Sequence, residues 1–179
     1  MKLFLKGSRC DTPRCAIERR DAPPGMQSGR RPKPTDYAVH LREKQKVKHY
    51  YGVLERQFRI YFAEASRQQG NTGDMLMRLF ERLLDNVVHR LGFGQSRAQA
   101  RQMVAHGHIT VNGHRCDIPS YLTKPGDVIR IKNRVKSLQL ALLNLSAQNR
   151  DVPDYLSRTE GEAPEGIVSR LPDAEDVSI

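Results

Sequence analysis

Basic and polar side chains with the spacing needed to bind phosphate are concentrated in residues 96–115. Arg97 and Arg101 are four residues apart on a predicted helix, so both guanidinium groups leave the same helix face. A predicted hairpin follows and adds Asn112, His114 and Arg115. Guanidinium, imidazole and amide groups are typical donors to phosphate oxygens. The spacing therefore predicts a phosphate-contacting surface built on a short helix and a hairpin.

Local sequence signals define the elements that hold these side chains. Ser96 and Gln99 form an S-x-x-Q capping box, which predicts a helix start, and Gly107 predicts its end. Residues 109–111 alternate as a half-buried strand does, and Asn112-Gly113 is a strong signal for a two-residue hairpin turn. A further turn and strand are predicted at Pro125-Gly126-Asp127 and Val128–Ile131.

This stretch resembles the αL RNA-binding motif, which is shared by a ribosomal protein, some tRNA synthetases, some pseudouridine synthases and a small heat-shock protein. The resemblance extends beyond the motif and covers nearly the whole chain. Residues 37–58 (YAVHLREKQKVKHYYGVLERQF), 70–73 (GNTG) and 84–94 (LDNVVHRLGFG) are similar to the bacterial small-subunit ribosomal protein S-four family. LREKQK followed by DNVVHRLGFG makes this resemblance specific.

The resemblance implies an α+β fold in which a helical first domain carries an inserted αL RNA-binding domain, with short helices packed on a small antiparallel-rich sheet. We expect an extended basic arm at residues 1–34, a helical domain at 35–93, an αL-type domain at 94–164 and an acidic C-terminal segment at 165–179. In the family, this last segment returns to the first domain. Family members usually carry a further N-terminal stretch before the position of Met1 and a final strand-forming stretch after that of Ile179, so the sequence leaves the return of the C-terminal segment open.

The resemblance also implies a function. We expect a structural constituent of the small ribosomal subunit, in the cytoplasm, that binds small-subunit ribosomal RNA directly and nucleates assembly of the subunit body. The family contacts neighbouring proteins, including small-subunit protein five, and contributes to translational accuracy.

The charge distribution independently indicates a polyanionic partner. The 179 residues carry a formal net charge of +10, and the pI is about 9.9. Residues 1–72 hold 16 Lys/Arg against 7 Asp/Glu, residues 73–135 hold 10 against 5, and residues 136–179 hold 4 against 8. Nucleic acid is the first candidate and an anionic membrane surface the second. No apolar run is long enough to cross a bilayer.

Two further groups of basic residues precede the αL stretch. A helix predicted from Thr35 or Asp36 to about Tyr51 carries four basic residues within positions 42–48, where they are opposed by Glu43 alone. We expect RNA-backbone contacts from Arg30, Arg31 and Lys33 on the arm and from Arg42, Lys44, Lys46 and Lys48 on the helix. The alternative is a solvated helix face without a partner.

Apolar periodicity predicts three more helices. One spans about residues 53–69 and has a packing stripe of Leu54, Phe58, Tyr61, Phe62 and Ala65. The next is a single helix at 74–91, and the third spans 137–149 with Leu138, Ala141, Leu142 and Leu145 facing inward. Residues 154–156 and 166–171 are strand-like.

The cysteine pattern is incomplete for a metal site. Cys10 and Cys15 form a C-x4-C pair, which would supply half of the four ligands of a tetrahedral zinc site. Some members of the family have an earlier second pair, which this sequence lacks, and nothing in the spacing of His40 and His49 makes them substitutes. We therefore expect free cysteines and no cofactor, with zinc only if further ligands exist.

Catalytic motifs are absent from the sequence. It has no phosphate loop, no G-x-S-x-G elbow, no H-E-x-x-H helix and no C-x-x-C pair. The alternative hypothesis is an RNA-modifying enzyme, or another RNA-binding protein, that uses the αL module to hold its substrate. An enzyme of this kind would need a separate catalytic domain, which residues 1–93 do not offer. We expect a non-enzymatic protein.

Overall fold

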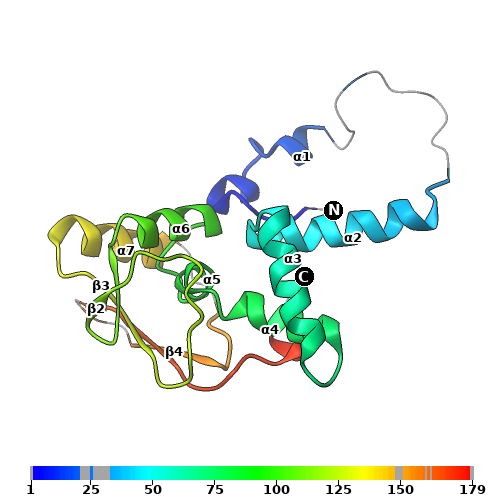
Figure 1. The fold of residues 1–179 in the computed structure, drawn as a ribbon. Helices are drawn as coiled ribbons and strands as arrows, with labels where there is room; N and C mark the ends of the chain where they lie inside the picture. Colours follow the sequence, from blue (N-terminus) through cyan, green and yellow to red (C-terminus); the bar gives the residue numbers. More distant parts are fainter. Residues whose placement is uncertain are drawn as a thin grey trace.

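The computed structural model describes residues 2–20, 25, 33–147, 151–159, 161 and 163–177. Figure 1 shows a helical part beside a second part in which helices pack on a small sheet. The expected α+β architecture is confirmed.

The helical part consists of α2 (Asp36–Tyr51), α3 (Glu55–Arg67) and α4 (Thr72–Glu81). The Thr35 hydroxyl caps α2 by accepting a hydrogen bond from the Ala38 N–H, and Gly52 ends the helix with φ +65°. The aromatic rings of Tyr51, Phe58 and Tyr61 surround Phe80. The complete helical core comprises Tyr51, Val53, Phe58, Tyr61, Ala65, Leu76, Leu79, Phe80 and Leu83.

Two members of the predicted α3 stripe are exposed rather than buried. Leu54 is the N-cap residue, and its extended backbone takes it off the helical stripe. Phe62 follows the buried Tyr61 by one residue, which is about 100° around the helix, so it leaves the face that packs on α4.

The single helix predicted at residues 74–91 is wrong, because the structure breaks it into α4 and α5 (Leu84–Arg90). Leu83 is extended, and the chain there pairs with a distant loop: the Thr123 N–H donates to the Arg82 carbonyl, and the Leu84 N–H donates to the Tyr121 carbonyl, both at 2.9 Å. The apolar periodicity continues through the break and therefore does not reveal it.

The predicted αL helix and hairpin are confirmed as α6 (Arg97–Ala105), β1 (Ile109–Val111) and β2 (His114–Arg115). The Ser96 hydroxyl accepts from the Gln99 N–H, while the Gln99 side chain accepts from the Gln95 N–H, one residue earlier than in a standard capping box. The sheet is completed by β3 (Val128–Ile131), β4 (Leu156–Thr159) and β5 (Glu165–Val168). All its pairs are antiparallel, in the order β2-β1-β3-β5-β4.

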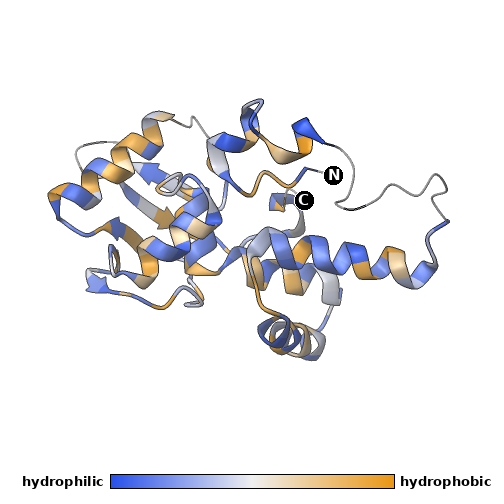
Figure 2. Ribbon diagram, turned by 90° about the horizontal axis from the view of Figure 1, so that it is seen from above, coloured by the Kyte–Doolittle hydropathy of each residue, from blue (hydrophilic) through white to orange (hydrophobic). Residues whose placement is uncertain are grey.

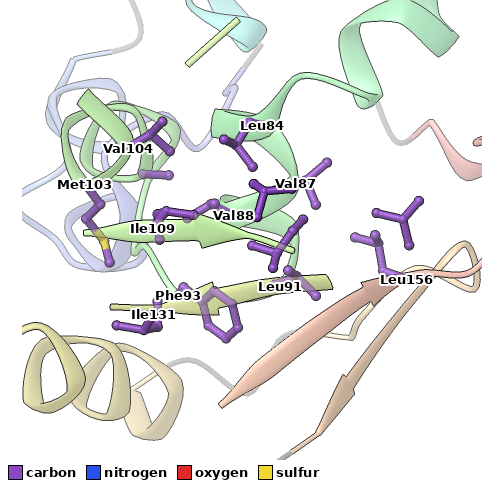
Figure 3. Close-up of a cluster of buried hydrophobic side chains, with 14 of the residues drawn as sticks. Leu84, Val87, Val88, Leu91, Phe93, Met103, Val104, Ile109, Ile131 and Leu156 are labelled. Atoms are coloured by element: carbon purple, nitrogen blue, oxygen red, sulfur yellow. The ribbon is translucent and has the colours of Figure 1, made fainter. Parts of the chain in front are cut away.

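A second core lies between this sheet and its helices (Figure 3). It includes Leu84, Val87 and Val88 of α5, together with Leu91 and Phe93, which follow the helix. These residues fall within the helical domain expected at 35–93, yet they pack with the sheet. We therefore propose that the boundary between the two parts lies at Leu83. Strand β5 likewise belongs to the sheet rather than to a separate segment at 165–179.

Helix α7 (Val135–Ala147) packs differently from its predicted stripe. Ala141 and Asn144 are buried, whereas Leu142 is exposed. The Asn144 side-chain amide donates to the Phe93 carbonyl at 2.7 Å, which explains how a polar residue occupies an inward position.

The sequence predicted an extended arm at residues 1–34, but the described part of this N-terminal segment is partly helical. It contains η1 (Gly7–Asp11) and α1 (Ala16–Arg19). Gly7 has φ +56° and lies against the backbone of Gln95, where an added Cβ would come within 2.7 Å of the carbonyl oxygen. Packing against the start of the αL module therefore orders a segment that has no core of its own. Arg30 and Arg31 lie outside the described residues.

The C-terminal segment contacts the helical part, which agrees with the return to the first domain that the resemblance implies. Asp173, just before η2 (Ala174–Asp176), forms an ion pair with Arg78 of α4 at 2.5 Å. Arg170 pairs with Asp176 at 2.7 Å and fixes the segment internally.

Candidate nucleic-acid interface

Helix α2 carries many hydrophilic residues, which are blue in the ribbon of Figure 2. Lys33 and Arg42 are exposed. Lys44 and Lys48 both bind the Glu55 carboxylate, at 2.7 and 3.2 Å, and Lys46 pairs with Glu43 at 2.6 Å. Sequence reasoning missed Glu55 because it belongs to the next helix.

These ion pairs do not remove the lysines from consideration as RNA contacts. Hydrogen bonds from Lys44 and Lys48 lower the pKa of Glu55 to about 2, so the carboxylate is ionised at neutral pH. Ion pairs between partly exposed side chains are worth at most about 1 kcal/mol, and a phosphate can replace the carboxylate as partner. The pairs orient the lysine side chains along α2.

Arg97 of the αL helix points into the junction between the two parts. Its Nε donates to the Asn86 side-chain oxygen at 2.8 Å, and its guanidinium carbon lies 3.7 Å from the ring centroid of Tyr50. The geometry gives Arg97 an internal structural role, and RNA contact by this residue stays a prediction.

Arg101, one turn later, is more accessible. Its Nη1 binds the Asp85 carboxylate at 3.0 Å, while 51% of the side chain is exposed, against 5% for Asp85. Burial raises the pKa of Asp85 to about 6, and the Arg101 charge opposes that rise. As predicted, Arg97 and Arg101 share a helix face: both reach neighbouring residues of α5.

A buried polar cluster links the basic helix α2 to the αL part. Glu81 is fully buried and accepts hydrogen bonds from Tyr51 Oη at 2.6 Å, Tyr155 Oη at 2.9 Å and Asn86 Nδ2 at 2.6 Å. Arg90 adds a bidentate contact at 2.7 and 3.1 Å. Burial opposes ionisation of Glu81, but Arg90 outweighs it, and the pKa is below its ordinary value. This Glu81 cluster therefore fixes the two candidate RNA-binding surfaces relative to each other.

In the hairpin, Asn112 holds the turn together. Its Nδ2 donates to Asp127 at 2.9 Å, its Oδ1 accepts from the Val128 N–H at 2.8 Å, and its φ is +52°. His114 and Arg115 are exposed beside it. The Arg115 guanidinium lies directly against Gly107, where any side chain would collide with it, and it pairs with Asp117 at 3.3 Å.

The structure adds Lys132 and Arg134 to this surface, which sequence reasoning did not single out. Pairing of β1 with β3 brings them to His106 and His108, and the Lys132 N–H donates to the His108 carbonyl. Burial lowers the pKa of His108, and the charges of His106, Arg134 and Lys132 lower it further. The alternating apolar pattern of the two strands was the signal that could have placed these residues together.

The described residues do not complete a metal site. Cys10 and Cys15 are buried, but no group of three or more His, Cys, Asp or Glu side chains that could hold an ion occurs in the described part of the chain. Two thiols alone do not close the tetrahedral coordination that structural zinc requires. Among the described helices, none is long and apolar enough to cross a membrane.

A capped helix leading into a hairpin, with basic side chains around both, is the architecture of an RNA-binding S4-type protein. Residues 82–129 match the S4 domain, and residues 1–81 match the family described as ribosomal protein S4/S9 N-terminal domain. The chain therefore combines a ribosomal N-terminal domain with an RNA-binding module.

Several full-length relatives specify the family. Small ribosomal subunit protein uS4 of Thermus thermophilus is 52% identical over 181 residues, covering all of this chain and 86% of the relative. The uS4 proteins of Thermoanaerobacter sp. and Thermodesulfovibrio yellowstonii are 51% and 49% identical, with the same coverage. The chain belongs to the family of small ribosomal subunit protein uS4.

Proposed function

We propose that this protein is a structural constituent of the small ribosomal subunit, in the cytoplasm, that binds small-subunit ribosomal RNA directly and nucleates assembly of the subunit body. Membership of the uS4 family supports the ribosomal role. The observation that carries the binding mode is the pair of basic surfaces, on α2 and on the αL module, fixed relative to each other by the buried Glu81 cluster.

The mechanism is electrostatic positioning rather than catalysis. Lysine and arginine side chains neutralise crowded phosphates and release counterions, while shape and 2′-hydroxyl contacts select the folded RNA. The relatives are ribosomal proteins, so the family does not favour the RNA-modifying alternative.

The side chains divide into two roles in this proposal. Those that reach the surface contact phosphate: Lys33, Arg42, Lys44, Lys46, Lys48, Arg101, His114 and Arg115, joined by His106, Lys132 and Arg134. Arg97 and Asn112 position these elements through the internal contacts described above. Arg30 and Arg31 are further candidates on the N-terminal segment.

Contact with small-subunit protein five and an influence on translational accuracy are part of this proposal, as the family resemblance implies. No cofactor is required for the binding mode. The two buried thiols would contribute to a zinc site only together with further ligands.

The assignment of phosphate contacts is tested by measuring affinity for small-subunit ribosomal RNA across a salt series. For Arg101→Ala with Arg115→Ala, we expect weaker binding and a salt slope reduced by roughly 1 to 2, since each lost phosphate contact lowers the slope by about 0.7–0.9. Arg130→Ala is the matched control, because Arg130 pairs with Glu165 within the sheet. An unchanged slope in the double variant would contradict the assignment.

A further inference from the structure

A cavity of about 170 Å³ opens between the helical part and the αL part. It lies where α3, the break before α5, helix α6 and the loop before β3 meet. Its lining residues are Val53, Leu54, Gln57, Tyr61, Leu83, Asp85, Arg101 and Ser120. Arg101 is also a predicted RNA contact, so the cavity adjoins the proposed interface.

The cavity is lined by the buried carboxylate of Asp85, which can accept further hydrogen bonds. Asp85 Oδ1 accepts from the Asn86 N–H at 2.8 Å, and Oδ2 accepts from Arg101 at 3.0 Å. An ionised carboxylate offers about four acceptor positions, so these bonds leave room for a further donor. A carboxylate that is 5% exposed and lines an open cavity is suited to receive the N–H groups of a ligand.

The size and walls of the cavity suit one aromatic ring. Val53, Leu83 and Tyr61 are buried and provide apolar surface. A cavity of about 150 Å³ holds benzene, so this space admits a single six-membered ring more readily than a two-ring purine. Gln57 and Ser120 add polar groups to the same lining.

We propose that this cavity binds one unpaired cytosine of the bound RNA, with its exocyclic amino group donating to the Asp85 carboxylate. The proposal rests on the proposed function, because the cytosine belongs to small-subunit ribosomal RNA. Proteins read single-stranded RNA by inserting bases and bonding their Watson–Crick edges, and Asp or Glu is the usual acceptor for the cytosine amino group. The half-exposed Arg101 guanidinium binds the adjoining phosphate.

The same geometry explains discrimination against uracil. Uracil presents a carbonyl oxygen where cytosine presents the amino group, and this oxygen would face the Asp85 carboxylate without a proton between them. An asparagine at position 85 carries an amide that can donate as well as accept, so Asp85→Asn is expected to lose the preference.

The first test blocks the cavity from its exposed rim. Ser120→Tyr is compared with wild type and with Ser66→Tyr, an exposed serine on α3 outside the cavity lining. Each full chain is bound to transcribed small-subunit ribosomal RNA, and the RNA is probed with a reagent that alkylates cytosine N3. We expect one unpaired cytosine that is protected by wild type and by Ser66→Tyr, but reactive with Ser120→Tyr, while the remaining footprint persists.

The second test changes the base. Replacing that cytosine with uracil is expected to weaken binding by wild type about tenfold and to leave the affinity of Asp85→Asn unchanged. If every cytosine reacts equally with wild type and Ser120→Tyr inside an intact footprint, the cytosine pocket is wrong and the proposed function stands. If no footprint forms with wild type, the proposed function is wrong, and the cytosine pocket, which rests on it, is wrong as well.

Discussion

At the residue scale, Asp85 combines a binding role with a cost in stability. Its pKa is about 6 in the folded protein, against an ordinary value of 3.8, because burial disfavours the charged form. An acid whose pKa is raised on folding favours the folded state most at low pH. This contribution is complete below about pH 3.8 and is lost as the pH rises through 6.

Asp85→Asn is therefore predicted to stabilise the free protein at pH 7 by up to about 3 kcal/mol and to have little effect near pH 4. The measurement is the free energy of unfolding by denaturant at both pH values. Asp117→Asn, at an exposed aspartate beside the hairpin, is the matched control and should change stability little. A destabilised Asp85→Asn protein at pH 7 would contradict this interpretation.

Asn112 provides a second residue-scale prediction. Asn112→Ala removes two internal hydrogen bonds and places alanine at positive φ, so we expect a loss of roughly 2–3 kcal/mol in unfolding free energy. Asn112→Gly removes the same bonds without the conformational strain and should lose less, by about 1 kcal/mol. Equal losses in the two variants would show that the backbone conformation is unimportant.

At the element scale, the sequence predicts best what is decided locally. Helix α6 and its hairpin were predicted correctly because the Ser96 cap, Gly107 and Asn112-Gly113 act within a few residues of the structures they define. The division between α4 and α5 was not predictable in this way. It depends on hydrogen bonds exchanged between Arg82 and Thr123, 41 residues along the chain: Arg82 Nε donates to the Thr123 carbonyl, and the Thr123 hydroxyl donates to the Arg82 carbonyl.

The candidate interface shows the same contrast between features that are evident locally in the sequence and features that depend on distant residues. The basic residue types and their positions were evident from the sequence, but their partners were not. Glu55 binds two lysines of the preceding helix, and Asn86 and Tyr50 engage Arg97 across the domain junction. Which basic side chains remain available to RNA therefore depends on how α3 and α5 pack on their neighbours, and this packing is not evident from the sequence.

At the scale of the whole molecule, the Glu81 cluster determines how the two proposed RNA-binding surfaces are oriented relative to each other. Glu81→Gln removes the carboxylate that forms the bidentate contact with the largely buried Arg90, so we predict a destabilisation of about 3–5 kcal/mol. Denaturant unfolding measures this loss. Glu43→Gln is the control: it breaks only the exposed pair with Lys46 and should cost less than about 0.5 kcal/mol.

The cluster also predicts a loss of binding that is separate from stability. Under conditions where Glu81→Gln stays folded, its affinity for ribosomal RNA should fall although no RNA-contacting side chain has changed, because α2 and the αL module are no longer fixed together. Full retention of affinity by the folded variant would show that the two surfaces bind independently.

Specific binding of small-subunit ribosomal RNA is tested most directly by chemical footprinting of the full chain on bacterial small-subunit ribosomal RNA, with a duplex of equal length as competitor. We expect protection confined to one multi-helix junction and an affinity at least about 1,000-fold above that for the duplex. Diffuse protection, with equal affinity for the competitor, would contradict specific binding of small-subunit ribosomal RNA.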